Sequence, residues 1–314
     1  MRVSRYPDVG LPEDARPAVT LGNFDGVHRG HRRAIDLLVE RARALGTQAI
    51  AVTFEPHPIS VLRPAEAPKR ILTPKVKEEI LGAAGLDELV IIAFTLEFSR
   101  IEPREFVEGI LVGRLRVREL VLGANFRFGR RRSGDLDSLR AYGNKHGFVV
   151  HEVDASMHRG EMISSSRIRV TLAGGQVDEA AAMLGRPYFL EGQVVEGAGR
   201  GRLMGFPTAN LDVEGDVLVG DGVYVTDSLV NGRVYQGMTH VGRRPTFGIE
   251  ERSVETHLFE LDRNIYGSTL RLFFHERIRG TVRFTSASEL ESQLHRDREH
   301  ARRFFHAHGR NLVL

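Results

Sequence analysis

The pattern of apolar positions divides the chain into two halves of different character. In the first half, short apolar runs alternate with amphipathic segments of helical length. The runs that predict strands are 18–21, 49–54, 89–94, 119–122 and 148–153, and the helical segments between them are 32–45, 75–84, 104–111 and 138–145. Strands separated by helix-length crossovers are typical of a parallel sheet with helices on both faces. We therefore predict a Rossmann-like α/β domain, which would bind ligands at the carboxyl ends of its strands.

From residue 188 onward, β-branched and aromatic residues dominate instead. The strand-like runs are 189–195, 223–230, 233–238, 254–261 and 270–278. Asn231-Gly232 lies between two of them and is a strong hairpin signal. Closely spaced strands joined by hairpins predict an antiparallel β-barrel or sandwich. One amphipathic helix follows, capped by Ser286 or Ser288, with an apolar stripe of Ala287, Leu290, Leu294, Ala301 and Phe305.

The chain is long enough for two domains, because 314 residues exceed the usual size of a single core. Residues 163–184 have a helical pattern, and Gly185-Arg-Pro187 interrupts it. We place the boundary there. The predicted domains are residues 1–184 and residues 185–314.

Composition narrows the class of protein. Hydrophobic residues make up 41% and charged residues 27%, as in ordinary globular proteins, and there is no cysteine for a disulfide or a thiolate site. The N-terminus lacks the apolar core of a signal peptide, and the run 89–94 is too short to span a bilayer. We expect a cytoplasmic chain without membrane contact. Self-association stays open.

The charge balance argues against a nucleic-acid partner. The net charge is only +3, from 44 basic and 41 acidic residues. The densest basic run, 127–132, suits a solvated loop or a small phosphorylated ligand better than a nucleic-acid backbone.

The strongest chemical signal is the turn at residues 20–31, which reads Thr-Leu-Gly-Asn-Phe-Asp-Gly-Val-His-Arg-Gly-His. It places His28 and His31 between a predicted strand and a predicted helix. Helix N-termini offer free N–H groups and a partial positive charge to phosphate. Imidazoles there can donate to phosphoryl oxygens as charge builds in a transition state. A glycine-rich turn can also be only a tight connection, but the pattern favours nucleotide phosphate chemistry.

A second candidate site lies just past the predicted boundary, at residues 197–210, which read Gly-Ala-Gly-Arg-Gly-Arg-Leu-Met-Gly-Phe-Pro-Thr-Ala-Asn. The glycines let the backbone approach a ligand closely, and the arginines add charge for a polyphosphate. Thr208 and Asn210, two apart on an extended segment, point to the same side and offer the hard oxygen ligands that suit Mg²⁺. The alternative is a flexible loop ahead of a strand.

The histidine turn resembles the His-x-Gly-His signature of nucleotidylyltransferases. In its longer form it resembles the FMN adenylyltransferase half of the bifunctional riboflavin kinase/FAD synthetase family. Ile163-Ser-Ser-Ser-Arg167 is similar to the second phosphate-binding signature of nucleotidylyltransferases, and residues 123–129 to a Gly-x-Asp/Asn-Phe-x-Phe-Gly motif. The resemblance implies ATP or phosphate contacts from Gly22, Asn23, Phe24, His57, Asn125, Ser164, Ser165 and Arg167, and flavin contacts from Phe54, Phe126 and Phe128. Without it, the serine-rich segment could equally be a capped structural helix.

The glycine-rich segment resembles the phosphate loop and Pro-Thr-Ala-Asn motif of riboflavin kinases, and further matches follow in order at 222–224, 242–247, 254–258 and 266–267. The resemblance implies that Glu255 is the base for the riboflavin 5′-hydroxyl; without the motif it would be read as a solvent-facing strand residue. The other implied contacts are ATP at Gly199, Arg200, Gly205 and Pro207, Mg²⁺ at Thr208 and Asn210, and flavin at Arg244. His240 and Asn264 depart from the family pattern, where asparagine and aspartate are common.

The resemblance implies two ATP-dependent steps, from riboflavin to FMN in the C-terminal half and from FMN to FAD in the N-terminal half. Three alternatives remain. A flavokinase with a degenerate adenylyltransferase half would not need intact histidines, and an adenylyltransferase for another substrate would not need the kinase-like half. A non-catalytic flavin- or nucleic-acid-binding protein would bind without turning over ATP.

Overall fold

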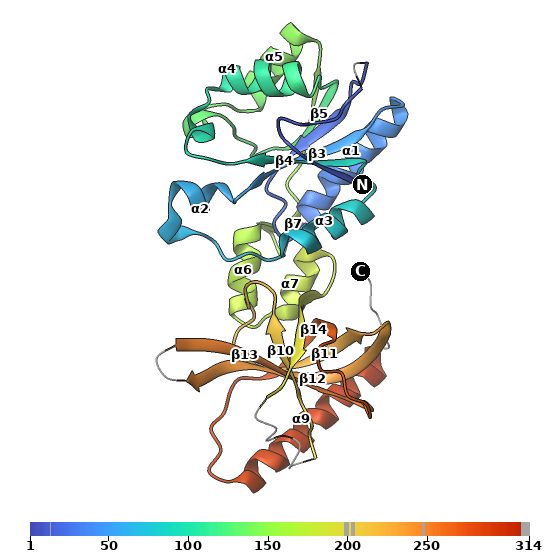
Figure 1. Ribbon diagram of the computed structural model, residues 1–314, viewed down its shortest axis with the longest axis vertical. Helices are drawn as coiled ribbons and strands as arrows, with labels where there is room; N and C mark the ends of the chain where they lie inside the picture. Colours follow the sequence, from blue (N-terminus) through green and yellow to red (C-terminus); the bar gives the residue numbers. More distant parts are fainter. Residues whose placement is uncertain (13, 198–200, 202–204, 247–248, 309–314) are drawn as a thin grey trace. The chain divides into compact units, whose positions relative to one another are not determined.

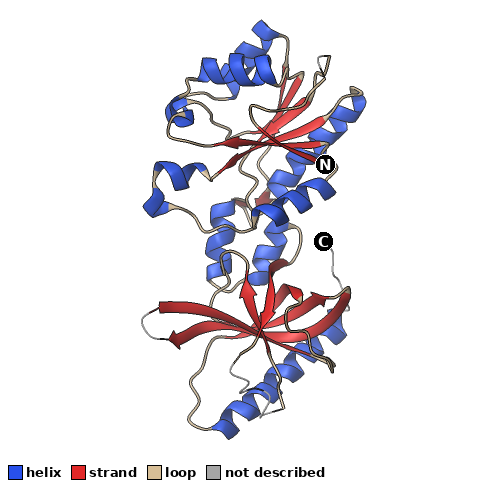
Figure 2. Ribbon diagram, in the orientation of Figure 1, coloured by secondary structure: helices blue, strands red, loops and turns tan. Residues whose placement is uncertain are grey.

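The predicted parallel strands of the first half form one sheet (Figures 1 and 2). The computed structural model describes residues 1–12, 14–197, 201, 205–246 and 249–308, with the backbone alone for 243–246 and 249–251. The strand order is β1-β4-β3-β2-β5-β6, and all neighbours are parallel. The strands are β1 (Arg2–Arg5), β2 (Ala18–Leu21), β3 (Ala49–Glu55), β4 (Glu88–Ala93), β5 (Glu119–Gly123) and β6 (Val149–Val153). The α/β prediction is confirmed.

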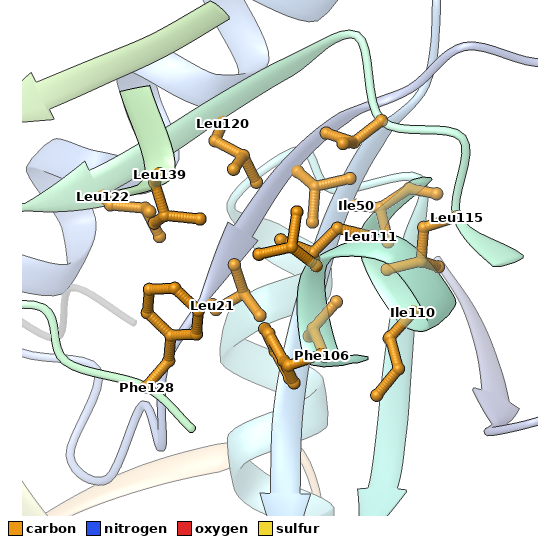
Figure 3. Close-up of a cluster of buried hydrophobic side chains, with 14 of the residues drawn as sticks. Leu21, Ile50, Phe106, Ile110, Leu111, Leu115, Leu120, Leu122, Phe128 and Leu139 are labelled. Atoms are coloured by element: carbon orange, nitrogen blue, oxygen red, sulfur yellow. The ribbon is translucent and has the colours of Figure 1, made fainter. Parts of the chain in front are cut away.

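Helices connect these strands, and a small hairpin follows them. The elements are α1 (Arg29–Ala44), α2 (Pro58–Leu62), η1 (Pro64–Glu66), α3 (Pro74–Ala83), η2 (Phe98–Arg100), α4 (Pro103–Glu105), η3 (Phe106–Arg114), η4 (Arg130–Arg132), α5 (Leu136–His146), β7 (Met157–His158) and β8 (Glu161–Met162). Strand alternation sends Leu21, Ile50 and Leu120 to one face, where they pack against η3 and α5 (Figure 3). Small residues such as Ala49 lie on the opposite face, and α1 packs against β2, β3 and β5.

The edge strand β1 was not predicted. Its sequence, Arg-Val-Ser-Arg, carries only one apolar residue, so it has no hydrophobic run. Polar contacts help to hold it instead, because the hydroxyl of Ser4 donates to Oε1 of the buried Glu88 at 2.5 Å and Arg2 pairs with the same carboxylate. Such a strand is specified by its partner on the sheet rather than by its own pattern.

The second half contains a closed antiparallel barrel of strand order β10-β13-β12-β11-β14-β9. The strands are β9 (Tyr188–Val195), β10 (Ala209–Val213), β11 (Gly222–Val230), β12 (Arg233–Thr246), β13 (Ile249–Leu258) and β14 (Thr269–Arg279). Asn231 and Gly232 join β11 to β12 with φ of 50° and 73°, the pair of positive values that a tight hairpin of this kind requires. The predicted barrel and hairpin are confirmed.

The C-terminal helix α9 (Ala287–His308) covers one side of the barrel. Ala301 and Phe305 on its apolar stripe pack with Val225, Met238 and Phe259. Of the two predicted caps, Ser286 is the one whose hydroxyl accepts a helix N–H, from Glu289 at 3.2 Å.

The chain forms two compact units, Met1–Ser164 and Ser165–Leu314. The second unit therefore includes α6 (Ser165–Ala173) and α7 (Val177–Leu184). The N–H of Gly220 donates to the carbonyl of Leu172 at 2.9 Å, and α7 packs against β9 and β14. Gly185 ends α7 in the left-handed conformation, so this glycine marks a helix end rather than the division between the compact units. The predicted boundary between functional domains at 184/185 stays a prediction.

Within the described part of the chain, no helix is long and apolar enough to cross a bilayer.

We expect Gly192→Ala to destabilise the barrel. A Cβ at this position would lie 2.1 Å from the carbonyl oxygen of Asp212 on the paired strand β10, so the backbone of one strand must shift. Overpacking of this kind typically costs about 1–3 kcal/mol. Urea unfolding followed by circular dichroism measures the loss. Gly109→Ala is the control, because Gly109 is exposed on η3 and its Cβ would meet no atom within 4 Å. Equal stability of both variants would contradict the expectation.

Candidate active sites

The turn after β2 is held in an uncommon backbone conformation. Phe24, Gly26 and Val27 have φ of 50°, 83° and 39°, and a positive φ is unusual for a β-branched residue such as Val27. The buried ring of Phe24 helps to hold the turn, as does the buried Asp25, whose Oδ1 accepts from the N–H of Ile71 at 3.0 Å. Strain that the surroundings impose in this way is typical of functional sites.

His28 and His31 lie together at the start of α1. The Nδ1 of His28 accepts the backbone N–H of His31 at 3.3 Å, so His28 is the N-cap of the helix. A nitrogen that accepts carries no proton, so the neutral ring holds its proton on Nε2. Gly30 leaves room for this ring, because a Cβ there would lie 3.1 Å from Cε1 of His28. The capping bond therefore places the proton of the neutral His28 ring on Nε2.

The two rings are stacked, with centroids 3.7 Å apart and planes inclined by 15°. Burial holds the pKa of His31 well below its usual value of 6.5, and the neighbouring His28 and Lys77 lower it further. His31 Nδ1 is buried and has no hydrogen-bond partner within the described part of the chain. His31 is therefore a neutral imidazole at physiological pH.

His57 repeats this arrangement at the start of α2. Its Nδ1 accepts the N–H of Ile59 at 3.2 Å, and its Nε2 lies 3.2 Å from Nδ2 of Asn23. A neutral imidazole accepts at only one nitrogen, so Nε2 carries the proton. We therefore assign the carboxamide oxygen of Asn23, turned about its last torsion, as the acceptor from His57. This orientation leaves the NH₂ group of Asn23 to donate to a ligand.

Asn23 and His57 line a small pocket, together with several residues that the sequence did not single out. Its lining comprises Asn23, Asp25, Phe54, Glu55, His57, Pro68, Arg70, Leu72, Pro74 and Lys77. The side chain of Lys77 is only 12% exposed, and burial lowers its pKa. One signal could have found it: Lys77 falls on the apolar stripe of its helix, at helical spacing from Ile80, Leu81 and Ala84.

Phenylalanine rings form a continuous run through the first unit. Phe54 contacts Phe98, which contacts Phe106, and this ring contacts Phe128, with centroids 6.0, 6.4 and 5.5 Å apart. Phe126 stacks on Phe128 at 6.0 Å. The run connects all three predicted flavin contacts of this unit. Phe128, at 6% exposure, belongs to the core, whereas Phe54 and Phe126 are partly exposed.

A larger pocket of about 440 Å³ adjoins the run at Phe98. Its other lining residues are Tyr6, Ile92, Ala93, Thr95, Glu97, Arg100, Ile101 and Glu105. The volume falls in the usual range for a pocket that holds a small molecule.

The remaining predicted contacts of the first site do not line the small pocket. Gly22 donates its N–H to the carbonyl of Val52 at 3.0 Å, and the amide of Asn125 contacts the sulfur of Met162 at 3.2 Å. Ser164 ends the first compact unit, whereas Ser165 and Arg167 begin the second. The place of these two residues beside the histidine turn stays a prediction.

Strand register builds the second site. Asn210 on β10 lies opposite Glu255 on β13, and Glu255 lies opposite His240 on β12. Directly opposed residues on antiparallel strands share one face, so the three side chains form a row. Burial lowers the pKa of His240, while the Glu255 carboxylate raises it and Arg279 lowers it. Gly242 makes room for this imidazole, because a Cβ there would lie 2.5 Å from Cε1 of His240.

Close packing holds the Pro-Thr-Ala-Asn segment. A Cβ on Gly197 would lie 1.9 Å from Nδ2 of Asn210, so only glycine lets the chain pass this amide without a shift. The Nδ1–H of His257 donates to the carbonyl of Pro207 at 2.8 Å, and the ring of Phe206 packs edge-on against His257. Gly205 has φ of 75°, the left-handed region. These contacts support the placement of the following Thr208.

Some predicted residues of this site cannot be placed. Gly199 and Arg200 lie outside the described residues, as does the side chain of Arg244. In the described part of the chain, no group of three His, Cys, Asp or Glu side chains could hold a metal ion. The oxygens of Thr208 and Asn210 fit Mg²⁺ by their chemistry, provided that phosphate and water complete the coordination.

Comparison with known proteins agrees with both halves of the resemblance. The family model described as FAD synthetase matches residues 11–167, and the one described as riboflavin kinase matches residues 184–305. A bifunctional riboflavin kinase/FMN adenylyltransferase from Escherichia coli K12 is 35% identical over 288 residues, covering 91% of this chain and 92% of its own. The protein of that name from Bacillus subtilis 168 is 34% identical over 299 residues, covering 93% and 94%.

A solved structure matches over almost the whole length. It is described as a macrolide-efflux protein from Streptococcus pneumoniae, is 31% identical, and superposes with a TM-score of 0.89 over 96% of this chain and 99% of its own.

The depressed pKa of His31 predicts that acid destabilises the first unit. Above about pH 6.5 the ring is neutral in both the folded and the unfolded chain, so its contribution is fully present. Below that value the unfolded chain binds a proton that the folded chain does not, and stability falls. Thermal melting at about pH 7.5 and 5.5 should show a smaller acid-induced drop for His31→Gln than for the unmodified chain. His306→Gln, at an exposed histidine, is the control and should keep the full drop. Equal drops in all three proteins would contradict the assignment.

Proposed function

Because the chain belongs to the family of bifunctional riboflavin kinases/FMN adenylyltransferases, we propose that it makes FAD in two steps, with the kinase site in the C-terminal half and the adenylyl-transfer site in the N-terminal half. The C-terminal half phosphorylates riboflavin to FMN, and the N-terminal half joins FMN to the adenylyl group of a second ATP. One observation carries the division of labour. Each unit has its own arrangement for phosphate chemistry, the histidine turn in the first and the row of Asn210, Glu255 and His240 in the second.

In the kinase step, the 5′-oxygen of riboflavin attacks the γ-phosphorus of ATP, ADP leaves, and Glu255 takes the hydroxyl proton. Glu255 is half-buried, in the middle of the row, where a carboxylate can accept a proton from a bound alcohol. Thr208 and Asn210 would hold Mg²⁺, which neutralises charge on the phosphates when it is bound. The glycine-rich loop, including Gly199, Arg200, Gly205 and Pro207, would surround the ATP phosphates. Most of the catalysis is positioning, as is usual for phosphoryl transfer.

In the adenylyl step, a phosphate oxygen of FMN attacks the α-phosphorus of ATP and pyrophosphate leaves. The nucleophile is already an anion, so it needs no strong base. Nε2–H of His28, the neutral ring of His31 and the NH₂ group of Asn23 can donate to phosphoryl oxygens as charge builds. Ser164, Ser165 and Arg167 would bind the leaving pyrophosphate, and Asn125 would donate to a phosphate.

The flavin ring of FMN would bind beside the aromatic run. The pocket of about 440 Å³ offers space next to Phe98, and Phe54 and Phe126 are partly exposed beside the core. Phe128 would support the ring wall from the core rather than touch the flavin. Phe54 lines the small pocket as well, so this arrangement would place the phosphate of FMN near His57. In the kinase unit, Arg244 would contact riboflavin.

Two of the competing functions do not account for a feature that this chain has. A flavokinase with a degenerate second half would not need the stacked, capping histidines, and an adenylyltransferase for another substrate would not need the kinase unit. The expectations of a cytoplasmic location, of no nucleic-acid partner and of open self-association stay predictions.

One incubation tests the proposal. The chain, riboflavin, ATP and Mg²⁺ are mixed, and flavins are separated by chromatography over time. FMN should form first and FAD should follow. FMN without FAD would support the flavokinase, and binding without any product would support the non-catalytic alternative. Removal of Mg²⁺ with a chelator should abolish the formation of both FMN and FAD.

His31→Ala should stop the second step alone. The change removes a donor to the adenylyl transition state, and one such donor is typically worth about 10²–10³ in rate. FAD formation from supplied FMN should fall by that factor, while FMN formation from riboflavin continues. Initial rates of both reactions on the same preparation measure this. Equal loss of both activities would instead indicate a folding defect.

Glu255→Gln should have the opposite effect. The amide keeps the shape and hydrogen-bonding reach of the side chain but cannot accept the hydroxyl proton, and general-base catalysis contributes about 10²–10⁴-fold. Riboflavin phosphorylation should fall by that order while riboflavin and ATP still bind, and supplied FMN should still become FAD. Unchanged phosphorylation by a folded variant would remove Glu255 from the mechanism.

A further inference from the structure

A mostly buried lysine lies in the first unit next to residues of the proposed adenylyl-transfer site. Lys77 comes from α3, and its side chain is 12% exposed. It lines the same small pocket as Asn23 and His57, which meet each other at 3.2 Å. Lysine is rarely buried unless its charge has a partner. The ammonium group of Lys77 therefore needs a negatively charged or hydrogen-bonding partner to offset the cost of burial.

The contacts of Lys77 within the protein are too long to offset the burial of its charge fully. Within the described part of the chain, Nζ of Lys77 lies 3.8 Å from Oε2 of Glu55 and 3.5 Å from Oγ1 of Thr53. Both distances exceed those of strong charged hydrogen bonds, which are about 2.7–2.9 Å. The carboxylate of Glu55 also pairs through Oε1 with Arg70, so Lys77 shares it. An ammonium group has three donors, and these contacts leave capacity for a ligand.

The charge of Lys77 also reaches the histidine turn. Together with burial and His28, it lowers the pKa of His31. The lysine is therefore close enough to act electrostatically on the residues that would contact the reacting phosphates. The charges around Lys77 itself come from Glu55, Asp25, Arg70 and Glu78.

We propose that Lys77 binds a phosphoryl oxygen of FMN or ATP in the adenylyl-transfer site. The proposal rests on the proposed function. His28, His31 and Asn23 donate as neutral groups, so they supply direction but no positive charge. FMN and ATP bring several negative charges, which increase at the α-phosphate and the leaving pyrophosphate as the bond exchanges. A poorly solvated ammonium beside those groups supplies positive charge and, in return, gains an acceptor.

Lys77→Met tests the proposal against Lys75→Met. Methionine keeps the length and apolar stem of the side chain, and Lys75 is an exposed lysine of the same helix. For Lys77→Met we expect kcat/KM of FMN adenylylation to fall by about 10²–10³-fold, in the range of a lost transition-state donor. Riboflavin phosphorylation by the same preparation and the melting temperature should stay near those of the unmodified chain. Lys75→Met should leave all three unchanged.

Separate titrations of the two substrates identify the phosphate. A rise confined to the KM for FMN assigns the contact to the FMN phosphate, and a rise confined to the KM for ATP assigns it to the triphosphate. A fall in kcat with both KM values unchanged places the contact in the transition state. Each of these results supports the proposal.

Three results would overturn it. Unchanged adenylylation kinetics in Lys77→Met would remove Lys77 from the site. Parallel loss of adenylylation and melting temperature would make Lys77 a structural partner of Glu55. If Lys77→Met does not fold, Lys77→Gln repeats the measurement with a polar side chain, and failure of both variants to fold also assigns a structural role. Absence of FAD synthesis by the unmodified chain would instead contradict the proposed function itself.

Discussion

The bond between a histidine Nδ1 and a backbone N–H at a helix start is the interaction on which the first site depends. Among the described residues it occurs at His28 on α1 and at His57 on α2. Each bond satisfies an N–H that the helix leaves free, a contribution of about 0.5–2 kcal/mol for ordinary caps. Each also fixes the tautomer, because a proton on Nδ1 would break the cap. The helices are thus capped by the same rings that we propose as phosphate contacts.

In the kinase unit, the pairing register of the strands plays the corresponding part. Thr226, Thr239 and Thr256, all fully buried, form a chain of hydroxyls with oxygens 2.7 and 2.9 Å apart across β11, β12 and β13. A slip by one residue would turn these hydroxyls to the other face of the sheet and break the chain. Glu255 precedes Thr256, so the same slip would reverse its side chain too. The buried threonines therefore help to hold Glu255 opposite Asn210.

The sequence predicted those elements whose own residues carry the signal, either an apolar pattern or a turn motif. β2 and β3 carry apolar side chains on both faces, and β11 with β12 carries its own turn at Asn231-Gly232. β1 could not be predicted, because its place depends on β4. Likewise, Gly185 ends a helix, but tertiary contacts decide which unit that helix joins.

The residues of the candidate sites also fall into two groups, those found in local sequence motifs and those placed by contacts with distant segments. His28, His31 and Glu255 lie in motifs that the chain spells out locally. Asp25 and Lys77 belong to the first site only through contacts with segments far away in sequence, Asp25 through Ile71 and Lys77 through Glu55. For Lys77 the sequence offers one signal, a charged residue on the apolar stripe of its helix.

The two sites use different chemistry because their nucleophiles differ. A phosphate is already an anion, so the proposed first site combines neutral imidazoles with positive charge and has no need of a base. An alcohol must lose a proton, so the proposed second site has a carboxylate. Burial lowers the pKa of His240, although Glu255 opposes the shift, and the ring therefore favours the neutral form. In the proposed mechanism, Glu255 accepts the proton beside this neutral imidazole, at a position where asparagine is common in the family.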